Sequence, residues 1–512
     1  MNLAQIIERH DASGVAFRFN GEDVTYGELR ARCAAVRGWC AEQGLEPGDR
    51  VALLLGGTPE FAVAYFGALG HGAVSVPLNP SSPPTELDRE LRTVRASVVL
   101  AGSEAAASGT GVVEDLRQLG HEVLGVGEVD GTAAAAAGGA AELAEGAAEV
   151  APVCEREPDD EAAYLFTSGT AGSPKAAILT HGSLLANIEQ VELRVGLAAT
   201  SDDISLLVVP PFHILGLNAV LGVQMFVGGR LVLVERFDAA SALETIQSER
   251  VTILAGVPQL FAALADLPEA TGDELRSVRL ACSGAAPLDA ETADRFERRF
   301  GVPIWQGYGL TEASPTVTFP DLAGRRDVHS VGVPLPGVEV RVVDADGEDV
   351  EPGDPGEVLV RGPNVFAGYF EDPAATSAAL DRRGWLHTGD VAAMADDGTL
   401  TIVDRKKDLI IVSGFNVFPG EVEQVLAECP GVAEAAVVGI PDEEHGESVR
   451  AFVVPDPSIW PEGDEVPSGI TAEDLMRRCS QHLARYKCPS QVTFVRELPH
   501  GLQGKVLRRV VG

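Results

Sequence analysis

The stretch from Tyr164 to Lys175 reads YLFTSGTAGSPK. Tyr164–Phe166 is a short apolar run that predicts a strand, and the apolar residues Ala176–Leu179 follow the stretch. Between them lie hydroxyl side chains, and glycines that let a backbone wrap closely around phosphate oxygens, while the closing ammonium group of Lys175 offsets their charge. The stretch therefore predicts a loop that binds a polyphosphate directly after a strand.

The loop is not a Walker loop, which needs glycine directly before its lysine and serine or threonine directly after it. Pro174 and Ala176 occupy those places here. A merely flexible loop is the alternative for this stretch taken alone. Lysine is scarce, however, and a rare ammonium group suggests a site that needs a point charge. Of 39 lysine and arginine residues only five are lysines: Lys175, Lys406, Lys407, Lys487 and Lys505.

On both sides of the loop, short β-branched runs alternate with longer amphipathic segments, which predicts parallel sheets covered by helices. The pairs are Arg50–Leu55 with Glu60–Leu69, Val251–Ala255 with Gln259–Ala265, and Val278–Ser283 with Ala290–Phe300. From Val331 to Leu400, glycine and proline turns separate short strands, as in β-rich, barrel-like structure. Beyond Asp404, the pattern predicts a separate α+β unit of about one hundred residues.

Composition limits the partners of the chain. The formal net charge of -37 over 512 residues disfavours binding of nucleic acid or anionic membranes, so an anionic substrate needs a local basic patch. The seven scattered cysteines contain no CxxC pair, and the first residues lack a secretion signal, so a reduced cytoplasmic protein is expected. The uncharged stretch Ile204–Gly229 is broken by prolines and glycines and predicts a buried β-α-β unit rather than a membrane span. Gly127–Val150, rich in Ala, Gly and Glu, predicts a mobile surface excursion.

Three further clusters carry groups suited to a nucleotide. Gln306–Glu312 reads QGYGLTE, where Tyr308 offers an aromatic face for a purine and Glu312 offers the hard oxygen ligand that Mg²⁺ prefers. Trp385–Asp390 reads WLHTGD and Asp404–Asp408 reads DRKKD; a carboxylate here suits ribose hydroxyls. Each of the last two alone would usually be a turn or a solvated charged face.

Together the four clusters resemble one family, the adenylate-forming acyl-CoA synthetases, which include aryl-CoA ligases and peptide-synthetase adenylation domains. The resemblance extends from Val24–Leu29 (VTYGEL) to Leu498–Lys505 (LPHGLQGK), nearly the whole chain. It implies an α/β fold: a large N-terminal domain of two α/β sheets plus a distorted β-barrel, and a small mobile C-terminal α+β lid. The implied domains are residues 1–403 and 408–512, with a hinge at 404–407.

The resemblance also implies where ATP and Mg²⁺ bind. Thr311 would meet the α-phosphate, and Glu312 with Thr170 would hold Mg²⁺. Asp390 and Arg405 would hold the ribose, and Lys505 would bridge the substrate carboxylate and the α-phosphate. The remaining nucleotide residues would be Thr167, Ser168, Gly169, Gly172 and Lys175 around the phosphates, and Gly284, Ala285, Ala286, Gln306, Gly307 and Tyr308 around the adenine.

For the acid and for coenzyme A, the resemblance implies a second set of residues. His213 resembles an aromatic gate beside an acyl pocket, with a satisfied core histidine as the alternative. Lys407 would be the hinge residue, and Gly414 would pass the pantetheine arm of CoA. Asn218, Val257 and Gly309 would line the acyl pocket.

The implied activity is ATP-dependent ligation of a medium- or long-chain fatty acid to CoA through an acyl-AMP, with release of pyrophosphate and then AMP. Three alternatives remain open at this point: an aryl or cyclic acid as substrate, an acyl-AMP ligase that loads a carrier protein, and a non-catalytic nucleotide-binding module. A homodimer is compatible with the sequence.

Overall fold

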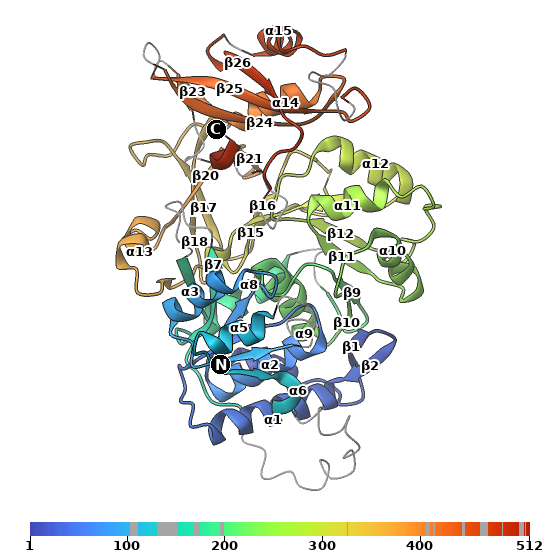
Figure 1. Cartoon of the computed structure of the whole chain (residues 1–512), viewed down its shortest axis with the longest axis vertical. Coiled ribbons are helices and arrows are strands. Elements are labelled where there is room, and N and C mark those ends of the chain that lie inside the picture. Colours follow the sequence, from blue (N-terminus) through green and yellow to red (C-terminus); the bar gives the residue numbers. More distant parts are fainter. Residues whose placement is uncertain are drawn as a thin grey trace. The chain divides into compact units, whose positions relative to one another are not determined.

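The computed structural model describes residues 1–102, 111–130, 152–167, 175–194, 199–324, 326–405, 410–412, 415–442, 446–460, 469–483, 485–500, 506 and 508–511 (Figure 1). The chain divides into two compact units, Met1–Glu339 with Val360–Leu386, and Val340–Leu359 with His387–Gly512. The predicted hinge at 404–407 begins in a strand and continues outside the described residues. The predicted domain boundary there stays a prediction.

The first unit contains a seven-stranded sheet whose neighbours from β13 to β1 are parallel, with β2 antiparallel to β1 at its edge. Its order is β13 (Ile304–Gln306), β12 (Leu280–Ser283), β11 (Ile253–Gly256), β9 (Ile204–Leu207), β10 (Arg230–Leu233), β1 (Val15–Phe19) and β2 (Glu22–Thr25). The parallel β-α units predicted between residues 251 and 300 are confirmed. They include α11 (Pro258–Ala265) and α12 (Ala290–Phe300), and α10 (Ala239–Ser248) precedes them, between β10 and β11 in the chain.

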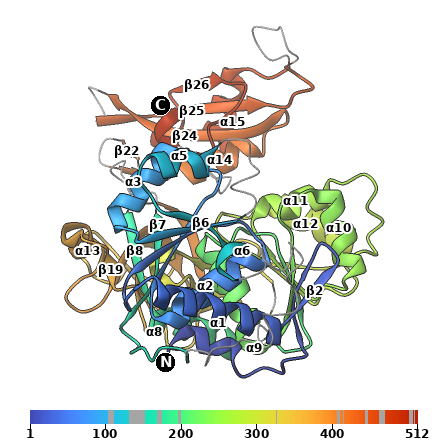
Figure 2. The ribbon, with the colours of Figure 1, turned by 60° about the horizontal axis from the view of Figure 1, so that its bottom comes forward.

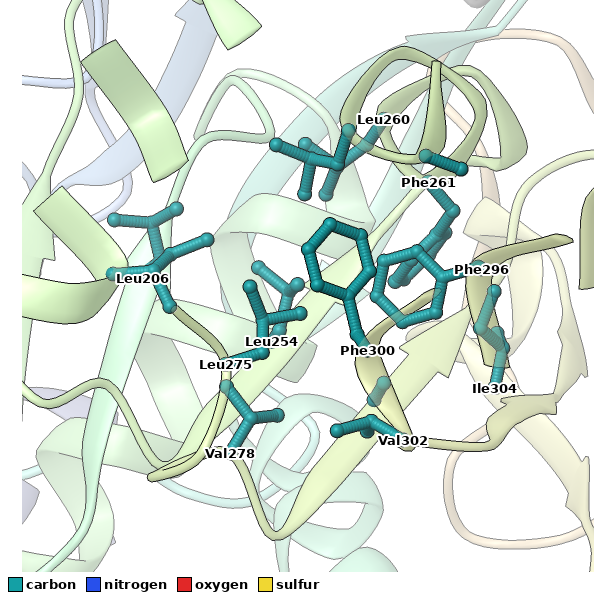
Figure 3. Packing of buried hydrophobic residues seen from close by; sticks show 14 of the residues in the cluster. Leu206, Leu254, Leu260, Phe261, Leu275, Val278, Phe296, Phe300, Val302 and Ile304 are labelled. Atoms are coloured by element: carbon teal, nitrogen blue, oxygen red, sulfur yellow. The ribbon is translucent and has the colours of Figure 1, made fainter. Parts of the chain in front are cut away.

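Helix α12 shows how the sequence produces this packing. Asp289 caps its N-terminus by accepting the Thr292 N–H, and Gly301, with φ of 70°, ends it. The phenylalanines at positions 296 and 300 are one turn apart, so both point into the core. The Phe296 ring meets those of Phe261 and Phe300, with centroids 5.2 Å and 5.0 Å away (Figure 3). This core fixes the sheet whose strand ends carry the candidate site.

The second seven-stranded sheet of this unit is parallel from β7 to β6 and antiparallel at its other edge. Its order is β19 (Gly368–Tyr369), β8 (Lys175–Thr180), β7 (Glu161–Thr167), β4 (Val74–Leu78), β3 (Arg50–Leu54), β5 (Val98–Ala101) and β6 (Val123–Gly125). Among its helices, α1 (Tyr26–Glu42) begins at a capping box of Thr25 and Glu28 and packs on α2 (Pro59–His71) (Figure 2). The others are α3 (Pro84–Val94), α5 (Val112–Gln118), α6 (Val126–Val129) and α8 (His181–Leu193).

The structure tests the predictions made for Ile204–Gly229 and for the tract 127–150. Ile204–Gly229 forms β9, then η3 (Leu215–Gly222) and α9 (Val223–Val227), followed by β10 parallel to β9, so the predicted β-α-β unit is confirmed. In the described part of the chain, no helix combines the length and apolarity needed to cross a bilayer. The predicted surface tract at 127–150 starts too early: α6 covers its first residues, and the buried Asp130 carboxylate lies 2.7 Å from Arg32 Nε. Residues 131–150 lie outside the described part.

The β-rich region forms smaller sheets. β14 (Tyr308–Gly309), β15 (Thr316–Phe319) and β16 (Val333–Pro334) make an antiparallel three-stranded sheet in the first unit. A four-stranded sheet, largely in the second unit, has the order β17 (Glu339–Val343), β18 (Pro355–Arg361), β20 (Leu386–Met394) and β21 (Leu400–Arg405). Helix α13 (Pro373–Ala379) follows β19.

The C-terminal part of the second unit is the predicted α+β structure. Its sheet has the order β23 (Phe415–Val417), β22 (Ile410–Val412), β25 (Gly446–Pro455) and β24 (Val432–Asp442), with β26 (Gln491–Phe494) parallel to β25. The helices are α14 (Pro419–Ala427), α15 (Ala472–His482) and α16 (Arg508–Val511). Arg508 binds the carboxylates of Glu423 and Asp404 at 2.6 Å and 2.9 Å, which ties α16 to α14 and β21. The predicted fold class is confirmed.

Candidate active site

The base of the predicted phosphate loop is a β-hairpin. Strand β7 ends at Thr167 and β8 begins at Lys175, and these two residues face each other across the antiparallel pair. Residues 168–174 lie outside the described part, and with them Ser168, Gly169, Thr170 and Gly172. The structure therefore places the first and last residues of the loop side by side.

A tyrosine lies between Lys175 and Glu312. Tyr369 belongs to β19, which runs antiparallel to β8 and pairs Tyr369 with Ala177. Its hydroxyl donates a hydrogen bond of 2.7 Å to Glu312 Oε1, and Lys175 Nζ lies 5.1 Å from the centroid of its ring. Burial, together with the negative charge of Glu312, raises the pKa of Tyr369, so the phenol stays protonated and remains the donor.

Backbone bonds hold the turn that carries Glu312. The turn η4 (Thr311–Ala313) follows β14, and the Glu312 carbonyl accepts the Phe366 N–H at 2.9 Å. The buried Asn364 amide donates to the Ala313 carbonyl at 2.9 Å. Asn218 donates at 2.7 Å to the Ser314 carbonyl and at 3.0 Å to that of Leu184. The described contacts of Asn218 thus support this turn, and its predicted contact with the acid stays a prediction.

The predicted adenine residues and Val257 follow neighbouring strands at one end of the first sheet. Gly256, Ser283 and Gln306 are register partners at the carboxyl ends of β11, β12 and β13, so the residues that follow them are neighbours. Such strand ends are where open parallel sheets bind ligands. Val257 follows the first strand, Gly284, Ala285 and Ala286 follow the second, and Gly307 and Tyr308 follow the third.

Two glycines of the predicted site, Gly307 and Gly309, leave no room for a side chain. A Cβ atom on Gly309 would lie 2.2 Å from the carbonyl oxygen of Pro315, and one on Gly307 would lie 2.8 Å from the Phe319 ring. Gly284 differs, because a Cβ there would meet only the methyl groups of Leu215, at 3.8 Å and 3.9 Å. A methyl group would therefore fit at Gly284, in ordinary van der Waals contact with Leu215.

His213 lies in the loop after β9. Its backbone N–H donates to the Pro210 carbonyl at 3.1 Å, and the centroid of its ring lies 4.8 Å from that of the Phe212 ring. Burial lowers the pKa of His213, so the ring is neutral at neutral pH. A neutral imidazole beside Leu215 suits an apolar substrate better than an anionic group at this point.

A cavity of about 220 Å³ lies beside this loop. It is lined by residues that follow β3, β4, β9 and β10, among them Gly56, Asn79 and Phe212. Arg236, an exposed guanidinium, also lines it. Glu235 lines the same cavity, so Arg236 is a basic group beside an acidic one rather than part of a basic patch.

The predicted ribose residues are neighbours within the second unit. Asp390 in β20 and Arg405 in β21 are register partners on adjacent antiparallel strands. Asp390 is buried, and its N–H donates to Thr388 Oγ1 at 3.1 Å. Lys407, Gly414 and Lys505 lie outside the described residues. Lys487 pairs with Glu421 at 2.7 Å, which gives it a structural partner.

The Glu312 carboxylate is an oxygen ligand that suits Mg²⁺ bound together with ATP phosphates. Among the described residues, no group of three or more His, Cys, Asp or Glu side chains can hold a metal ion. Glu312 would therefore supply a single carboxylate to the ion. Mg²⁺ is commonly bound in this way, by one or two carboxylates, water and substrate phosphates, rather than by a protein cage.

Sequence reasoning missed Tyr369. The residue lies in Gly368-Tyr369-Phe370, with no local pattern that marks a nucleotide site. Its position depends on the pairing of β19 with β8, two strands far apart in the sequence.

The chain is similar to known proteins over nearly its whole length. Residues 4–370 match the model of the AMP-binding enzyme family, and residues 421–505 match that of the AMP-binding enzyme C-terminal domain. The chain is 37% identical to a feruloyl-CoA synthase of an Amycolatopsis species, over 98% of this chain and 96% of that protein. It is 36% identical to a long-chain-fatty-acid–CoA ligase of Escherichia coli O157:H7, over 96% of this chain and 90% of that protein.

The crystal structure of ATP-bound MatB from Rhodopseudomonas palustris is also similar. Its TM-score is 0.88 at 32% identity, with 100% of this chain and 98% of that chain covered.

Proposed function

Because the chain belongs to the AMP-binding enzyme family, we propose that it joins a medium- or long-chain fatty acid to coenzyme A. Its enzyme class is that of an acyl-CoA synthetase, an AMP-forming acid–thiol ligase that works through an acyl-adenylate. The substrates are then a carboxylic acid, ATP and CoA.

The chemistry explains why positive groups are needed. A carboxylate is a poor acyl donor, because oxide would have to leave from an electron-rich carbonyl carbon. Its attack on the α-phosphorus of ATP forms the acyl-AMP, expels pyrophosphate and crowds negative charge around phosphorus. Lys505, Lys175 and the loop donors stabilise that charge, with about 3 kcal/mol from each preorganised donor.

Other residues hold the nucleotide. Thr311 contacts the α-phosphate, Tyr308 stacks on the adenine, and Asp390 with Arg405 binds the ribose. Glu312 and Thr170 are the protein ligands of Mg²⁺. When bound, Mg²⁺ acts as a Lewis acid on the phosphate oxygens.

The surroundings of His213 carry the proposal of an apolar acid. The neutral ring of His213 comes just before Leu215, the first residue of η3, and the aliphatic side chain of Leu215 lies beside Gly284, which has no side chain of its own. Val257 follows the neighbouring strand. Transfer of an alkyl chain from water to such apolar surroundings lowers its free energy.

An aryl acid is the second candidate. Gly284 has no side chain that would exclude a ring, and the 37% identity to the feruloyl-CoA synthase is within one percentage point of the 36% identity to the fatty-acid ligase.

CoA is the proposed acceptor in the second step, in which its thiol displaces AMP. Lys407 is the proposed hinge of the C-terminal lid, and Gly414 passes the pantetheine arm once Lys505 has moved away. The cavity beside Phe212, with Arg236 at its wall, offers the phosphates of CoA a basic contact. All seven cysteines are free thiols, which favours a reducing compartment, and we propose the cytoplasm.

The test is an AMP-release assay over fatty acids of graded chain length, with ferulate and 4-coumarate alongside. We expect release that requires ATP, Mg²⁺ and CoA together and that increases with alkyl chain length. Release with the aromatic acids alone would establish the aryl alternative. If carboxylate-dependent pyrophosphate release is accelerated by a carrier protein and not by CoA, the acceptor is a carrier protein rather than CoA. If the protein binds ATP but no acid causes pyrophosphate release, the proposed synthetase activity is refuted.

A further inference from the structure

Tyr369 connects two groups of the proposed site that lie far apart in the sequence. Its hydroxyl binds Glu312, and its ring carries the ammonium group of Lys175. We propose that Tyr369 is a positioning residue that holds the Glu312 carboxylate in the orientation that receives Mg²⁺ with ATP. This inference rests on the proposed function, in which Glu312 is a ligand of Mg²⁺.

The hydrogen bond restricts the carboxylate. A phenol has one hydrogen to donate, and the Tyr369 hydroxyl oxygen lies 2.7 Å from Glu312 Oε1. A bond from a neutral donor to a charged acceptor is stronger than one between neutral groups, so rotation of the carboxylate away from Tyr369 is costly. A carboxylate has about four lone-pair sites, so one accepted bond leaves capacity for a metal ion.

The backbone around Tyr369 makes it a rigid support. The Ala367 N–H donates to the Ile178 carbonyl at 3.0 Å, and the Phe370 N–H donates to that of Ala176 at 2.9 Å. The Tyr369 N–H donates to Thr376 Oγ1 at 2.9 Å. The first two bonds attach β19 and its flanks to β8, the strand that begins with Lys175, and the third attaches β19 to α13. The Tyr369 ring also meets the Phe366 ring edge-on, with centroids 5.0 Å apart.

The neighbouring glycine shows how close the packing is. Gly368 has φ of 132°, and a Cβ on it would lie 2.6 Å from Thr376 Cγ2. The backbone before Tyr369 therefore has a conformation that other residues rarely adopt, in a space that has no room for a side chain.

The hydroxyl and the ring of Tyr369 serve different partners, which allows them to be tested separately. Tyr369→Phe removes the bond to Glu312 and keeps a ring for Lys175. Tyr369→Leu removes both interactions. The matched control is Tyr164→Phe, because the Tyr164 hydroxyl also binds a glutamate, Glu161, at 2.5 Å, but both residues belong to β7, and the phenylalanine keeps the ring that packs on Phe370.

The experiment measures binding of a fluorescent ATP analogue by the full chain as Mg²⁺ is titrated, and again in EDTA. For Tyr369→Phe we expect the Mg²⁺ concentration at half-saturation to rise about tenfold, as is common when the partner of a metal ligand is lost. Binding in EDTA should stay at the wild-type level. Tyr369→Leu should also weaken binding in EDTA, because Lys175 loses its support, and Tyr164→Phe should match the wild type in both conditions.

A Tyr369→Phe protein that melts like the wild type and keeps its Mg²⁺ dependence would overturn the proposal. Glu312→Gln separates this failure from that of the proposed function. If Glu312→Gln loses the Mg²⁺ dependence and Tyr369→Phe does not, the role of Tyr369 is refuted and that of Glu312 stands. If Glu312→Gln keeps the Mg²⁺ dependence, Glu312 is not a metal ligand, and both assignments fail even if the Tyr369 variants do not fold.

Discussion

At the scale of single residues, the contacts around Gly309 make a sharp prediction. In Gly309→Ala the new methyl group would lie 2.2 Å from the Pro315 carbonyl oxygen and 3.1 Å from Thr316 Cα. These are backbone atoms and cannot move aside as the end of a side chain can. We expect a loss of about 1 to 3 kcal/mol in the free energy of unfolding and displacement of the turn with Thr311 and Glu312.

The measurements are urea unfolding and acid-dependent pyrophosphate release, and the latter should be nearly abolished. Gly38→Ala is the control, because Gly38 lies inside α1 with no atom near its Cβ position, and alanine there should stabilise by about 0.5 to 1 kcal/mol. A Gly309→Ala protein as stable and active as the wild type would show that the turn can rearrange.

At the scale of elements, His181 joins the N-terminal 3-10 helix η1 (Leu3–Ile7) to the start of α8. Its Nδ1 accepts the Leu3 N–H at 3.0 Å, so this nitrogen carries no proton in the folded chain. Burial, and next the charge of Arg156, lowers the pKa of His181 to about 4. The unfolded chain takes up a proton near pH 6.5, whereas the folded chain does not do so until about pH 4. Lowering the pH between these values therefore favours unfolding.

The integrated loss between pH 6.5 and 4 is on the order of 3 kcal/mol. In His181→Gln, an amide oxygen can accept the Leu3 N–H without titrating. Urea midpoints at pH 7, 6 and 5 should therefore fall more steeply for the wild type than for this variant. Parallel slopes would mean that other groups govern the acid response.

The same elements show what a sequence can predict. The periodicity of Ala290–Phe300 predicted α12 to the residue, because Ala293, Phe296 and Phe300 repeat at the spacing of one buried helix face. The pairing of β1 with β10, and of β19 with β8, joins residues far apart in the chain, which no local pattern encodes. That is why Glu312 and Lys175 were recognised from their own motifs, whereas Tyr369, which contacts both, was not.

At the scale of the whole molecule, the net negative charge and the assignment of key lysines to two different units both bear on the proposed mechanism. A chain with net charge -37 must bind the polyanions ATP and CoA, so its few ammonium groups gain importance. Lys175 begins β8 in the first unit, whereas Lys505 belongs to the second. The proposed mechanism uses Lys505 in the first half-reaction only, since the thiol must afterwards take its place.

The matching variants are Lys505→Met and Lys487→Met, two changes that each remove one ammonium group from the C-terminal part of the chain. Lys487 is paired with Glu421 at 2.7 Å, so its loss should cost modest stability and leave turnover within a fewfold of the wild type. Lys505→Met should slow acyl-AMP formation by about 100-fold or more, because the charge growing on the α-phosphate loses a preorganised partner. Thioester formation from supplied acyl-AMP should continue at nearly the wild-type rate. Rapid-quench assays of each half-reaction distinguish the two steps, and equal losses in both would mean that Lys505 supports the fold or both conformations rather than adenylation alone.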